Sequence, residues 1–443
     1  MNMHSFEFPR ANRSTIAARP SRLPMALFAI LGLVLFWLIL SRSLVAYLAT
    51  TAPEAALFLR SGDPAALLTL TERELNFTNK DKTTTAGQSG AVSKPLGQLR
   101  KQVETALAAD PLNAWAYRLL GQLAEVEQSG PKTMRLMQAA ARHSLEETIA
   151  VDWMMRKSFE NKDYPAAAFY ADALLRNHPQ LMDYASPILG RMAENKDAMG
   201  QLEKLLATNP PWRSQFFQGF GAVITDARTP LAILLSLKNT AVSPTAADLR
   251  GYMSFLFQHK LYDLAYYTWL QFLPSEQLAN AGFLFNGSFE TEPSGLPFDW
   301  AMPQGVGIIL DIAPKPEAVD KHALFLEFGQ GRVNFPGVFQ TVMLPPGAYR
   351  FKGSFKGEVA GRRGMQWSIS CMSGAAIGES QMILGSYPVW QDFEFAFAVP
   401  DSGCRPQSLR LGLTARSASE QLFSGSIWFD NLSISRQPAD PAK

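Results

Sequence analysis

Residues with reactive side chains are sparse in this 443-residue chain, and their spacing excludes the common catalytic and metal motifs. No His-Glu-x-x-His or Cys-x-x-Cys pair is present, so the sequence offers no zinc site. It also contains no Gly-x-Ser-x-Gly elbow for a serine nucleophile. The glycine-rich stretch at 357–364 lacks the Lys-Ser/Thr ending of a phosphate-binding loop and is predicted to be a turn. The histidines are scattered, at His4, His143, His178, His259 and His322.

Paired carboxylates are the remaining route to catalysis, because glycoside hydrolysis needs two of them at a set separation. Sequence does not show that separation, so a glycan-modifying enzyme stays open as a less favoured alternative. Acidic residues of the C-terminal third, such as Glu379 and Asp392, have the pattern of ordinary surface acids. We therefore expect a protein that is not an enzyme.

Cys371 and Cys404 are the only cysteines, and about thirty residues of strand-like sequence separate them. In an oxidising compartment they would form a disulfide, and closing a loop of that size contributes about 3 to 4 kcal/mol in the chain-entropy model. The alternative is a pair of unrelated buried thiols.

The N-terminal segment determines the compartment. Residues 23–41 are uncharged and overwhelmingly apolar, and at 1.5 Å per residue they span about 28 Å, close to the hydrocarbon thickness of a bilayer. The flanking arginines keep the N-terminus in the cytoplasm by the positive-inside rule. We expect a basic cytoplasmic tail at 1–22, a transmembrane helix at 23–48 and the bulk of the chain in the periplasm, as in a single-pass protein of a bacterial inner membrane. The arginines are Arg10, Arg13, Arg19 and Arg22, against one acid, Glu7.

A cleaved signal peptide is the competing interpretation of this segment. The apolar run is longer than a usual signal core, and Pro53 follows the nearest small-residue site. An uncleaved anchor is therefore favoured. Both interpretations place the rest of the chain outside the cytoplasm.

The charge balance argues against a nucleic-acid partner. The chain has 41 basic and 39 acidic residues, spread along its length, for a formal net charge of +2. No patch is basic enough to gather DNA or RNA.

The apolar residues change period near residue 280, from helical spacing to strand alternation. We expect a multidomain protein in which an all-α region precedes an all-β sandwich. Its predicted parts after the membrane helix are a first helical unit at 53–78, a flexible linker at 79–97, helical repeats at 98–280, a β-sandwich at 283–436 and a disordered tail at 437–443.

The helical part repeats itself at a period near 34 residues. Prolines that end helical segments are spaced by about 68, 31, 34 and 30 residues, at Pro111, Pro179, Pro210, Pro244 and Pro274. The unit from Ala106 to Glu125, with Trp115, Leu119 and Gly121, resembles a tetratricopeptide repeat. The resemblance implies about four to six stacked units that form a solenoid with a protein-binding concave surface. A rigid spacer is the alternative.

The late helices carry a dense group of aromatic residues, which we expect to form core or the junction with the next domain rather than a ligand groove. The group comprises Phe216, Phe217, Phe220, Tyr252, Phe255, Phe257, Tyr266, Tyr267 and Trp269.

The C-terminal part contains eight or nine strand-like runs over about 150 residues, which predicts a sandwich. Its opening FNGSFE at 285–290, the glutamine before the PPGAY hairpin, and the closing WFDN resemble the jelly-roll carbohydrate-binding modules of the galactose-binding-like group. That resemblance implies a structural calcium near Glu290 and Asp430, for which oxygen ligands are suited. The alternative is that these carboxylates accept backbone hydrogen bonds where the termini of the domain meet.

The same resemblance implies sugar recognition through exposed aromatic rings, because the apolar C–H face of a pyranose stacks on a flat ring. The candidates are Trp300, Trp367, Tyr387 and Trp390. Each has the alternative of being a core ring. Trp428 lies within an apolar strand pattern.

Together these modules indicate a non-catalytic, membrane-anchored accessory factor in making or exporting an exopolysaccharide or other envelope polysaccharide. Its helical repeats would bind protein partners, and its sandwich would bind polysaccharide. The alternative is a purely structural scaffold for envelope protein complexes that binds no glycan.

Overall fold

The computed structural model describes residues 22–84, 95–279, 281–315 and 317–438. The chain divides into two compact units, with the boundary between residues 154 and 155. Most of the expected N-terminal tail, the middle of the expected linker and the end of the expected C-terminal tail lie outside the described residues.

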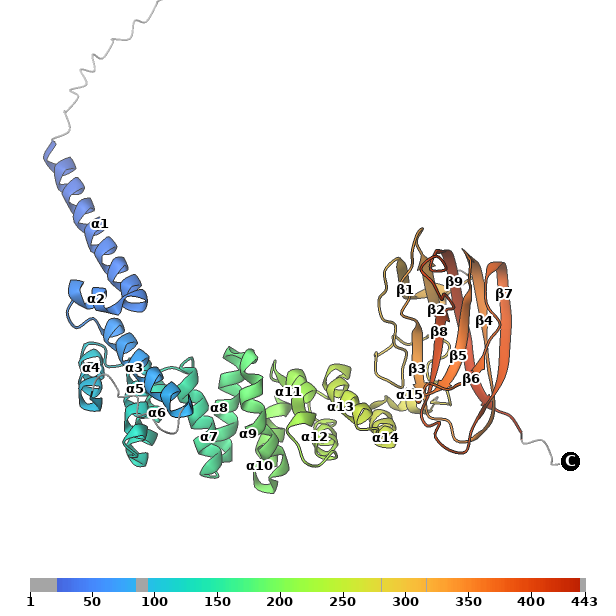
Figure 1. Ribbon diagram of the computed structural model, residues 1–443, viewed down its shortest axis with the longest axis horizontal. Coiled ribbons are helices and arrows are strands. Elements are labelled where there is room, and N and C mark those ends of the chain that lie inside the picture. The colour runs from blue at the N-terminus through green and yellow to red at the C-terminus, as the bar shows by residue number, and fades with distance from the viewer. Residues whose placement is uncertain (1–21, 85–94, 280, 316, 439–443) are drawn as a thin grey trace, which may run out of the picture. The chain divides into compact units, whose positions relative to one another are not determined.

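The first unit is helical and begins with one long apolar helix (Figure 1). Within the described ranges, one helical segment, Leu27–Thr51, is long and apolar enough to cross a membrane. The helices are α1 (Arg22–Thr51), α2 (Pro53–Leu59), α3 (Pro64–Thr84), α4 (Leu96–Ala109), α5 (Ala114–Val126) and α6 (Gly130–His143), and α7 (Thr148–Glu160) crosses the unit boundary.

The predicted linker at 79–97 is too long. Helix α3 continues to Thr84 and α4 begins at Leu96, so both ends of the expected linker are helical. The reason is that the stretch from 79 to 84 is polar but contains no glycine or proline to end the helix.

The second unit continues with helices and ends in the sandwich. Its helices are α8 (Tyr164–Asn177), η1 (Pro179–Leu181), α9 (Met182–Glu194), α10 (Lys196–Ala207), α11 (Arg213–Gly219), η2 (Phe220–Ala222), α12 (Thr229–Leu237), α13 (Ala246–Gln258), α14 (Tyr262–Phe272) and α15 (Ser275–Ala279).

One helix-ending turn recurs in the helical region with the same backbone hydrogen bonds. Gln128, Lys162 and Lys260 all have positive φ, at 57°, 62° and 58°. In each case the next amide donates to the carbonyl five residues before it, as in the bond from Ser129 to Ala124. Gln128 and Lys162 are 34 residues apart, which is the period that the prolines indicated.

Each unit also contains a buried arginine that is neutralised by acids of other helices. Arg118 of α5 lies 2.8 Å from Glu72 of α3 and 2.6 Å from Glu147. Arg213 of α11 lies 2.7 Å from Asp248 of α13, and both are nearly inaccessible to solvent. These pairs connect helices that are far apart in sequence.

The described strands form two antiparallel sheets, one of five strands in the order β1-β2-β9-β4-β7 and one of four in the order β3-β8-β5-β6 (Figure 1). This confirms the predicted sandwich and its eight or nine strands. The strands are β1 (Ile308–Lys315), β2 (Ala318–Phe328), β3 (Val338–Val342), β4 (Gly347–Gly361), β5 (Met365–Cys371), β6 (Ala376–Glu379), β7 (Gly385–Val399), β8 (Gln407–Leu413) and β9 (Phe423–Arg436).

The opening signature of the sandwich, FNGSFE at 285–290, has a structural role. The Asn286 side chain donates to the Thr291 carbonyl and accepts from the Thr291 backbone amide. Phe289 is fully buried. At Gly287 a Cβ would lie 1.9 Å from the Leu432 carbonyl oxygen. The Leu432 amide donates to Gly287 at 2.8 Å, so only glycine permits this close approach of the two ends of the domain.

A buried glutamine ties the same segment to the sandwich. The side-chain oxygen of Gln340 accepts a hydrogen bond from the Phe285 backbone amide at 3.0 Å, and its side-chain nitrogen donates to the Phe285 carbonyl at 2.9 Å. This is the glutamine of the predicted signature, and its partner lies 55 residues away.

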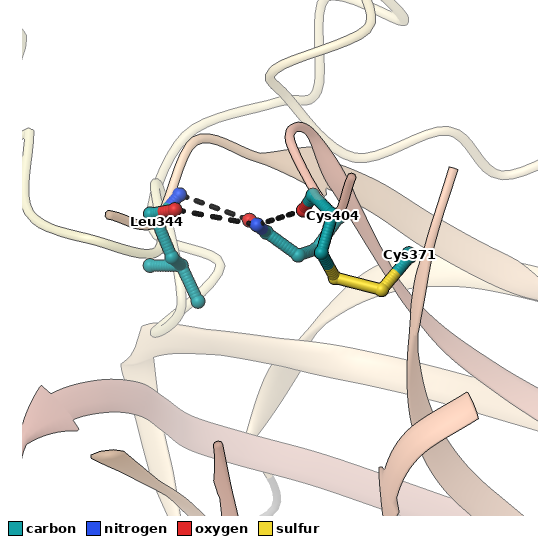
Figure 2. Close-up of a disulfide and its surroundings, with 4 residues drawn as sticks. Leu344, Cys371 and Cys404 are labelled. Carbon is teal, nitrogen blue, oxygen red and sulfur yellow. Dashed lines mark hydrogen bonds between the residues drawn. A yellow bond between two sulfur atoms is a disulfide. The ribbon is translucent and has the colours of Figure 1, made fainter. Parts of the chain in front are cut away.

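The expected disulfide is formed between Cys371 and Cys404, with the Cα atoms 4.6 Å apart. Figure 2 shows it beside Leu344, with dashed hydrogen bonds that are made by the buried Gln407 side chain. Gln407 bonds both backbone groups of Leu344 and the carbonyl of Cys404. The disulfide and the Gln407 side-chain amide therefore hold the segments at Leu344, Cys371 and Cys404 together at one end of the sandwich.

Aromatic rings join the last helices to the sandwich inside the second unit. The ring centroid of Trp269 is 5.0 Å from Phe285 and 5.7 Å from Phe298, and Phe257 is 5.6 Å from Phe298. Of the late-helix aromatics, Phe216, Phe217 and Phe220 are instead buried within the helical part.

Candidate functional site

The outer face of the five-stranded sheet carries a pair of partly buried aromatic rings that pack against one another at a tilt. Ile427 and Phe429 of β9 are fully buried, so Trp428 between them points away from the core. On β2, Leu324 and Leu326 are buried in the same way, and Phe325 points outward. Phe325 pairs directly with Trp428 across the two strands, and their ring centroids are 4.4 Å apart at an interplanar angle of 37°.

A row of side chains continues across the sheet on both sides of this pair. Lys356 of β4 is the other cross-strand neighbour of Trp428, and Asp311 of β1 is the neighbour of Phe325. Side chains opposite one another on one face lie within contact range. The aromatic pair is therefore flanked by a cation on one side and a carboxylate on the other.

A second aromatic site lies at the β7 end of this row. The Nζ of Lys315 is 4.8 Å from the centroid of the Trp390 ring, which is the geometry of a cation–π contact. The indole N–H of Trp390 donates to Glu317 at 3.4 Å, and Glu317 also pairs with Lys356. We refer to Phe325, Trp428, Lys356, Glu317, Trp390, Lys315 and Asp430 as the outer-face cluster.

Ion pairs fix the charges of the outer-face cluster. The hydrogen bond from Lys356 lowers the pKa of the Glu317 carboxyl, so this group is ionised at neutral pH. Lys315 pairs with Asp430, whose side chain is 4% exposed. Both lysines are thus held by carboxylates while they border the aromatic rings. The arrangement offers flat apolar rings edged by positioned donors and acceptors.

Two of the four predicted glycan-binding aromatics are core residues, and their prediction is wrong for that reason. Trp300 and Trp367 are both 0% exposed, with ring centroids 5.9 Å apart. The Trp300 indole is bonded to the Asn286 carbonyl at 2.9 Å. A ring enclosed on both faces has no surface on which a sugar can stack.

Of the other two, only Trp390 belongs to the outer face. Tyr387 is half-buried against Phe355, with ring centroids 4.8 Å apart, and its hydroxyl donates to the Leu384 carbonyl. Tyr387 packs on the core and is not a platform. Trp390 stays a candidate because its ring borders the outer-face cluster.

Glu290 and Asp430 do not fit the calcium that the resemblance implied. Asp430 pairs with Lys315 through Oδ2 and accepts the Asn431 amide through Oδ1, so an ammonium group lies where a cation would bind. Glu290 instead lies beside His322, whose amide donates to it at 3.3 Å. In the described ranges no group of three or more His, Cys, Asp or Glu could hold a metal ion.

Sequence reasoning missed Phe325 and Trp428, although a signal for both was present. In LFLEF and IWFD the flanking apolar residues are the buried ones, so strict alternation would have placed the middle aromatic on the opposite face. The lysines gave no signal, since their roles depend on strands far apart in sequence.

Two cavities of the second unit border the surroundings of this cluster, but neither is lined by Phe325, Trp428 or Trp390. One of about 610 Å³ is bordered by Glu290, Trp300 and His322, and one of about 640 Å³ by Glu290, Lys352 and Asn431. A chain-like ligand that stacks on rings needs an open face rather than a deep cavity. We therefore favour the outer-face cluster over the cavities as the site.

Comparison with known proteins gives results for the sandwich only. No family model matches the sequence, and no curated protein matches it. A structure described as "CBM4 structure and function" is 17% identical, covers 35% of this chain and 99% of its own, and has a TM-score of 0.26. The structure of TmCBM61 in complex with β-1,4-galactotriose is 19% identical over 35% and 99%, with a TM-score of 0.24. The CBM22-1 xylan-binding domain from Paenibacillus barcinonensis is 16% identical over 34% and 93%, with a TM-score of 0.23. Likeness at this level is no evidence of a shared ligand.

Proposed function

We propose that this protein is a non-catalytic, membrane-anchored glycan-binding factor whose sandwich binds polysaccharide on the outer face of the five-stranded sheet. Helix α1 anchors the chain in a bacterial inner membrane, with the N-terminus in the cytoplasm and the chain that follows α1 in the periplasm. The role that fits this layout is an accessory one, in making or exporting an envelope polysaccharide.

The observation that carries the proposal is the outward pair of Phe325 and Trp428, with ring centroids 4.4 Å apart at an interplanar angle of 37°. Aromatic rings paired on a partly exposed sheet surface provide an apolar platform for the C–H faces of pyranose rings. Trp390, held by Lys315 and Glu317, adds a second ring on the same face. A platform with two separated aromatic sites suits a ligand of several sugar units.

The polar members of the cluster support recognition of hydroxyl groups. Lys356 and Glu317 hold one another, and the buried Asp430 holds Lys315. The remaining donors and acceptors of Lys356, Glu317 and Lys315 therefore have fixed directions. Binding to such preorganised groups avoids the entropy cost of ordering long side chains.

The state of the carboxylates supports a binding role over catalysis. A glycosidase acid needs a raised pKa so that it carries a proton at neutral pH. Glu317 has a lowered pKa, and Asp430 is paired with a lysine. Glu317 is therefore not suited to donate a proton to a glycosidic oxygen, and Asp430 already serves as the buried partner of Lys315.

The helical region supports a second, protein-binding role. The recurring turn at Gln128, Lys162 and Lys260 is what tetratricopeptide-type repeats would need at each hairpin. Stacked repeats of this kind present an extended surface to protein partners. In this proposal the repeats recruit a protein of the polysaccharide machinery.

Affinity electrophoresis of the full chain tests the proposal. The protein is solubilised in a detergent without a sugar headgroup and run through gels that contain single neutral or acidic polysaccharides. We expect retardation by at least one of them and no release of reducing ends. If no polysaccharide retards the folded protein, the chain is a structural scaffold that binds no glycan. Release of reducing ends would instead indicate an enzyme.

A further inference from the structure

The short helix α2 presents an apolar surface beside the apolar helix α1. Phe58 is 90% exposed and Leu59 is 54% exposed. On α1, Tyr47 is 65% exposed and Leu44 is 47% exposed. The described residues of the first unit leave all four uncovered, although such side chains are stabilised by removal from water.

Packing fixes α2 at the last turns of α1 (Figure 1). Small and β-branched residues of the three helices α1, α2 and α3 form one buried cluster, so α2 cannot swing away from α1 without opening it. The buried members are Val45, Ala49, Ala56 and Ala66, with Leu48, Leu57 and Ala65 packed against them.

The end of α1 is also held by a side chain of α3. Arg73 donates to the Thr50 carbonyl at 3.2 Å and to the Thr51 carbonyl at 3.4 Å. These are carbonyls that a helix C-terminus leaves without partners. Helices α1, α2 and α3 are therefore joined at this end by packing and by hydrogen bonds.

The position of α2 along α1 places it at the membrane surface. The uncharged run ends at Arg42. Val45 and Ala49 lie three and seven residues further on, or about 4.5 and 10 Å along the axis. The interfacial layer on each side of a bilayer is about 5 to 7 Å thick, so Val45 lies within this layer and Ala49 lies just beyond its outer edge. Tyr47 lies at the same level, where tyrosine is typical of membrane proteins.

We propose that α2 is an interfacial helix, with Phe58 and Leu59 inserted at the boundary between lipid headgroups and acyl chains of the bilayer that α1 spans. The proposal rests on the anchor in the proposed function and extends it. Arg60, which follows Leu59, lies among the lipid phosphates in this arrangement. The contact would fix the orientation of the first helical unit on the membrane.

Site-directed fluorescence in lipid nanodiscs tests this on the full chain. The native cysteines form a disulfide, so one introduced cysteine can be labelled with a water-sensitive fluorophore. Ala55, exposed on α2, is labelled with Phe58 retained. Ala109 is the matched control, because it is exposed on α4 and lies three residues before Leu112, which is 71% exposed. A label at Phe36 reports on the span itself.

The expected result is that dithionite reduces the label at Ala55 several-fold more slowly than the label at Ala109. Lipids that carry a nitroxide at the level of the headgroups should quench the label at Ala55 but not the label at Ala109. Replacing Phe58 and Leu59 by serine should remove the protection at Ala55, and Leu112→Ser should leave Ala109 unchanged. Equal reduction at Ala55 and Ala109, with Phe36 protected, would overturn the interfacial helix and leave the anchor intact. Loss of protection at Phe36 would overturn both.

Discussion

Phe325 of β2 and Trp428 of β9 are paired across the sheet with their ring centroids 4.4 Å apart, on the face that points away from the core. Their strand neighbours supply the core of the sandwich, so the fold does not require aromatic residues at these two outward positions. Both rings are only partly buried, and clustered aromatic surface that folding does not fully cover is typical of a binding site. This pair is the basis of the proposed function.

Removing the lysine that pairs with Asp430 should destabilise the sandwich. In Lys315→Met the nearly buried Asp430 carboxylate loses its partner, and breaking such a pair costs about 3 kcal/mol. Urea denaturation of the full chain, followed by near-ultraviolet circular dichroism, measures the loss.

Lys356→Met is the matched control, because its partner Glu317 is 48% exposed and water screens an exposed pair, so its loss should change stability far less. Equal losses in the two variants would contradict the role given to Lys315.

Chelation should leave the sandwich unchanged. Lys315 already neutralises Asp430, and Glu290 contacts His322 instead. We expect the same melting temperature with EDTA as with added calcium, measured by scanning calorimetry. A rise in melting temperature with calcium that Asp430→Asn abolishes would show that the two carboxylates bind the ion after all.

The disulfide should stabilise the sandwich by constraining its unfolded state. Replacing Cys371 and Cys404 by serine should lower the free energy of unfolding by about 3 to 4 kcal/mol. The control is the wild type in reductant, which should approach the stability of the double variant. Unchanged stability in both would mean that the buried Gln407 network alone holds this end of the domain.

The ion pair of Arg213 and Asp248 gives a prediction for pH. Burial alone would raise the pKa of Asp248, but hydrogen bonds from the Thr245 amide, Arg213 and Ser214 outweigh it and lower the pKa. In the unfolded chain the Asp248 carboxyl has a pKa of about 3.9, so on acidification the unfolded chain takes up a proton before the folded chain does. The stability that ionised Asp248 contributes is therefore fully present above about pH 3.9. It is lost as the pH falls through the lowered pKa of the folded state.

Asp248→Asn should therefore lose about 3 to 5 kcal/mol at neutral pH, and its deficit relative to the wild type should shrink below about pH 4. Urea denaturation at several pH values measures both quantities. Asp197→Asn, an exposed change on α10, is the control and should follow the wild type throughout. A deficit for Asp248→Asn that grows on acidification would have the wrong sign.

Local sequence patterns were sufficient to predict the strands, because the alternation of apolar and polar residues is a local signal. The disulfide could be predicted because the chain has only two cysteines. The local patterns did not separate core aromatics from surface ones. Trp300 is buried because the segment before β1 folds back on the sandwich, held by the bonds of Gln340 to Phe285. That contact spans 55 residues, and no local pattern reports it. Trp428 was predictable in principle, since Ile427 and Phe429 alternate with it.

The charged part of the site was beyond sequence reasoning for a related reason. Lys315 and Asp430 are 115 residues apart and meet only because β1 and β9 belong to one sheet. Without the strand order, either residue is an ordinary surface charge. The same lysine is the reason that Asp430 does not fit the calcium that the resemblance implied.

The most direct test of the account is isothermal titration calorimetry. A polysaccharide that retards the protein in affinity electrophoresis is titrated into two full-chain variants. Trp428→Ala removes the central ring, whereas Val389→Ala removes an exposed apolar side chain, 61% accessible, from the edge strand β7. We predict that Trp428→Ala weakens binding at least tenfold, or about 1.4 kcal/mol, and that Val389→Ala binds as the wild type does. Unchanged affinity in a folded Trp428→Ala protein would contradict the central claim.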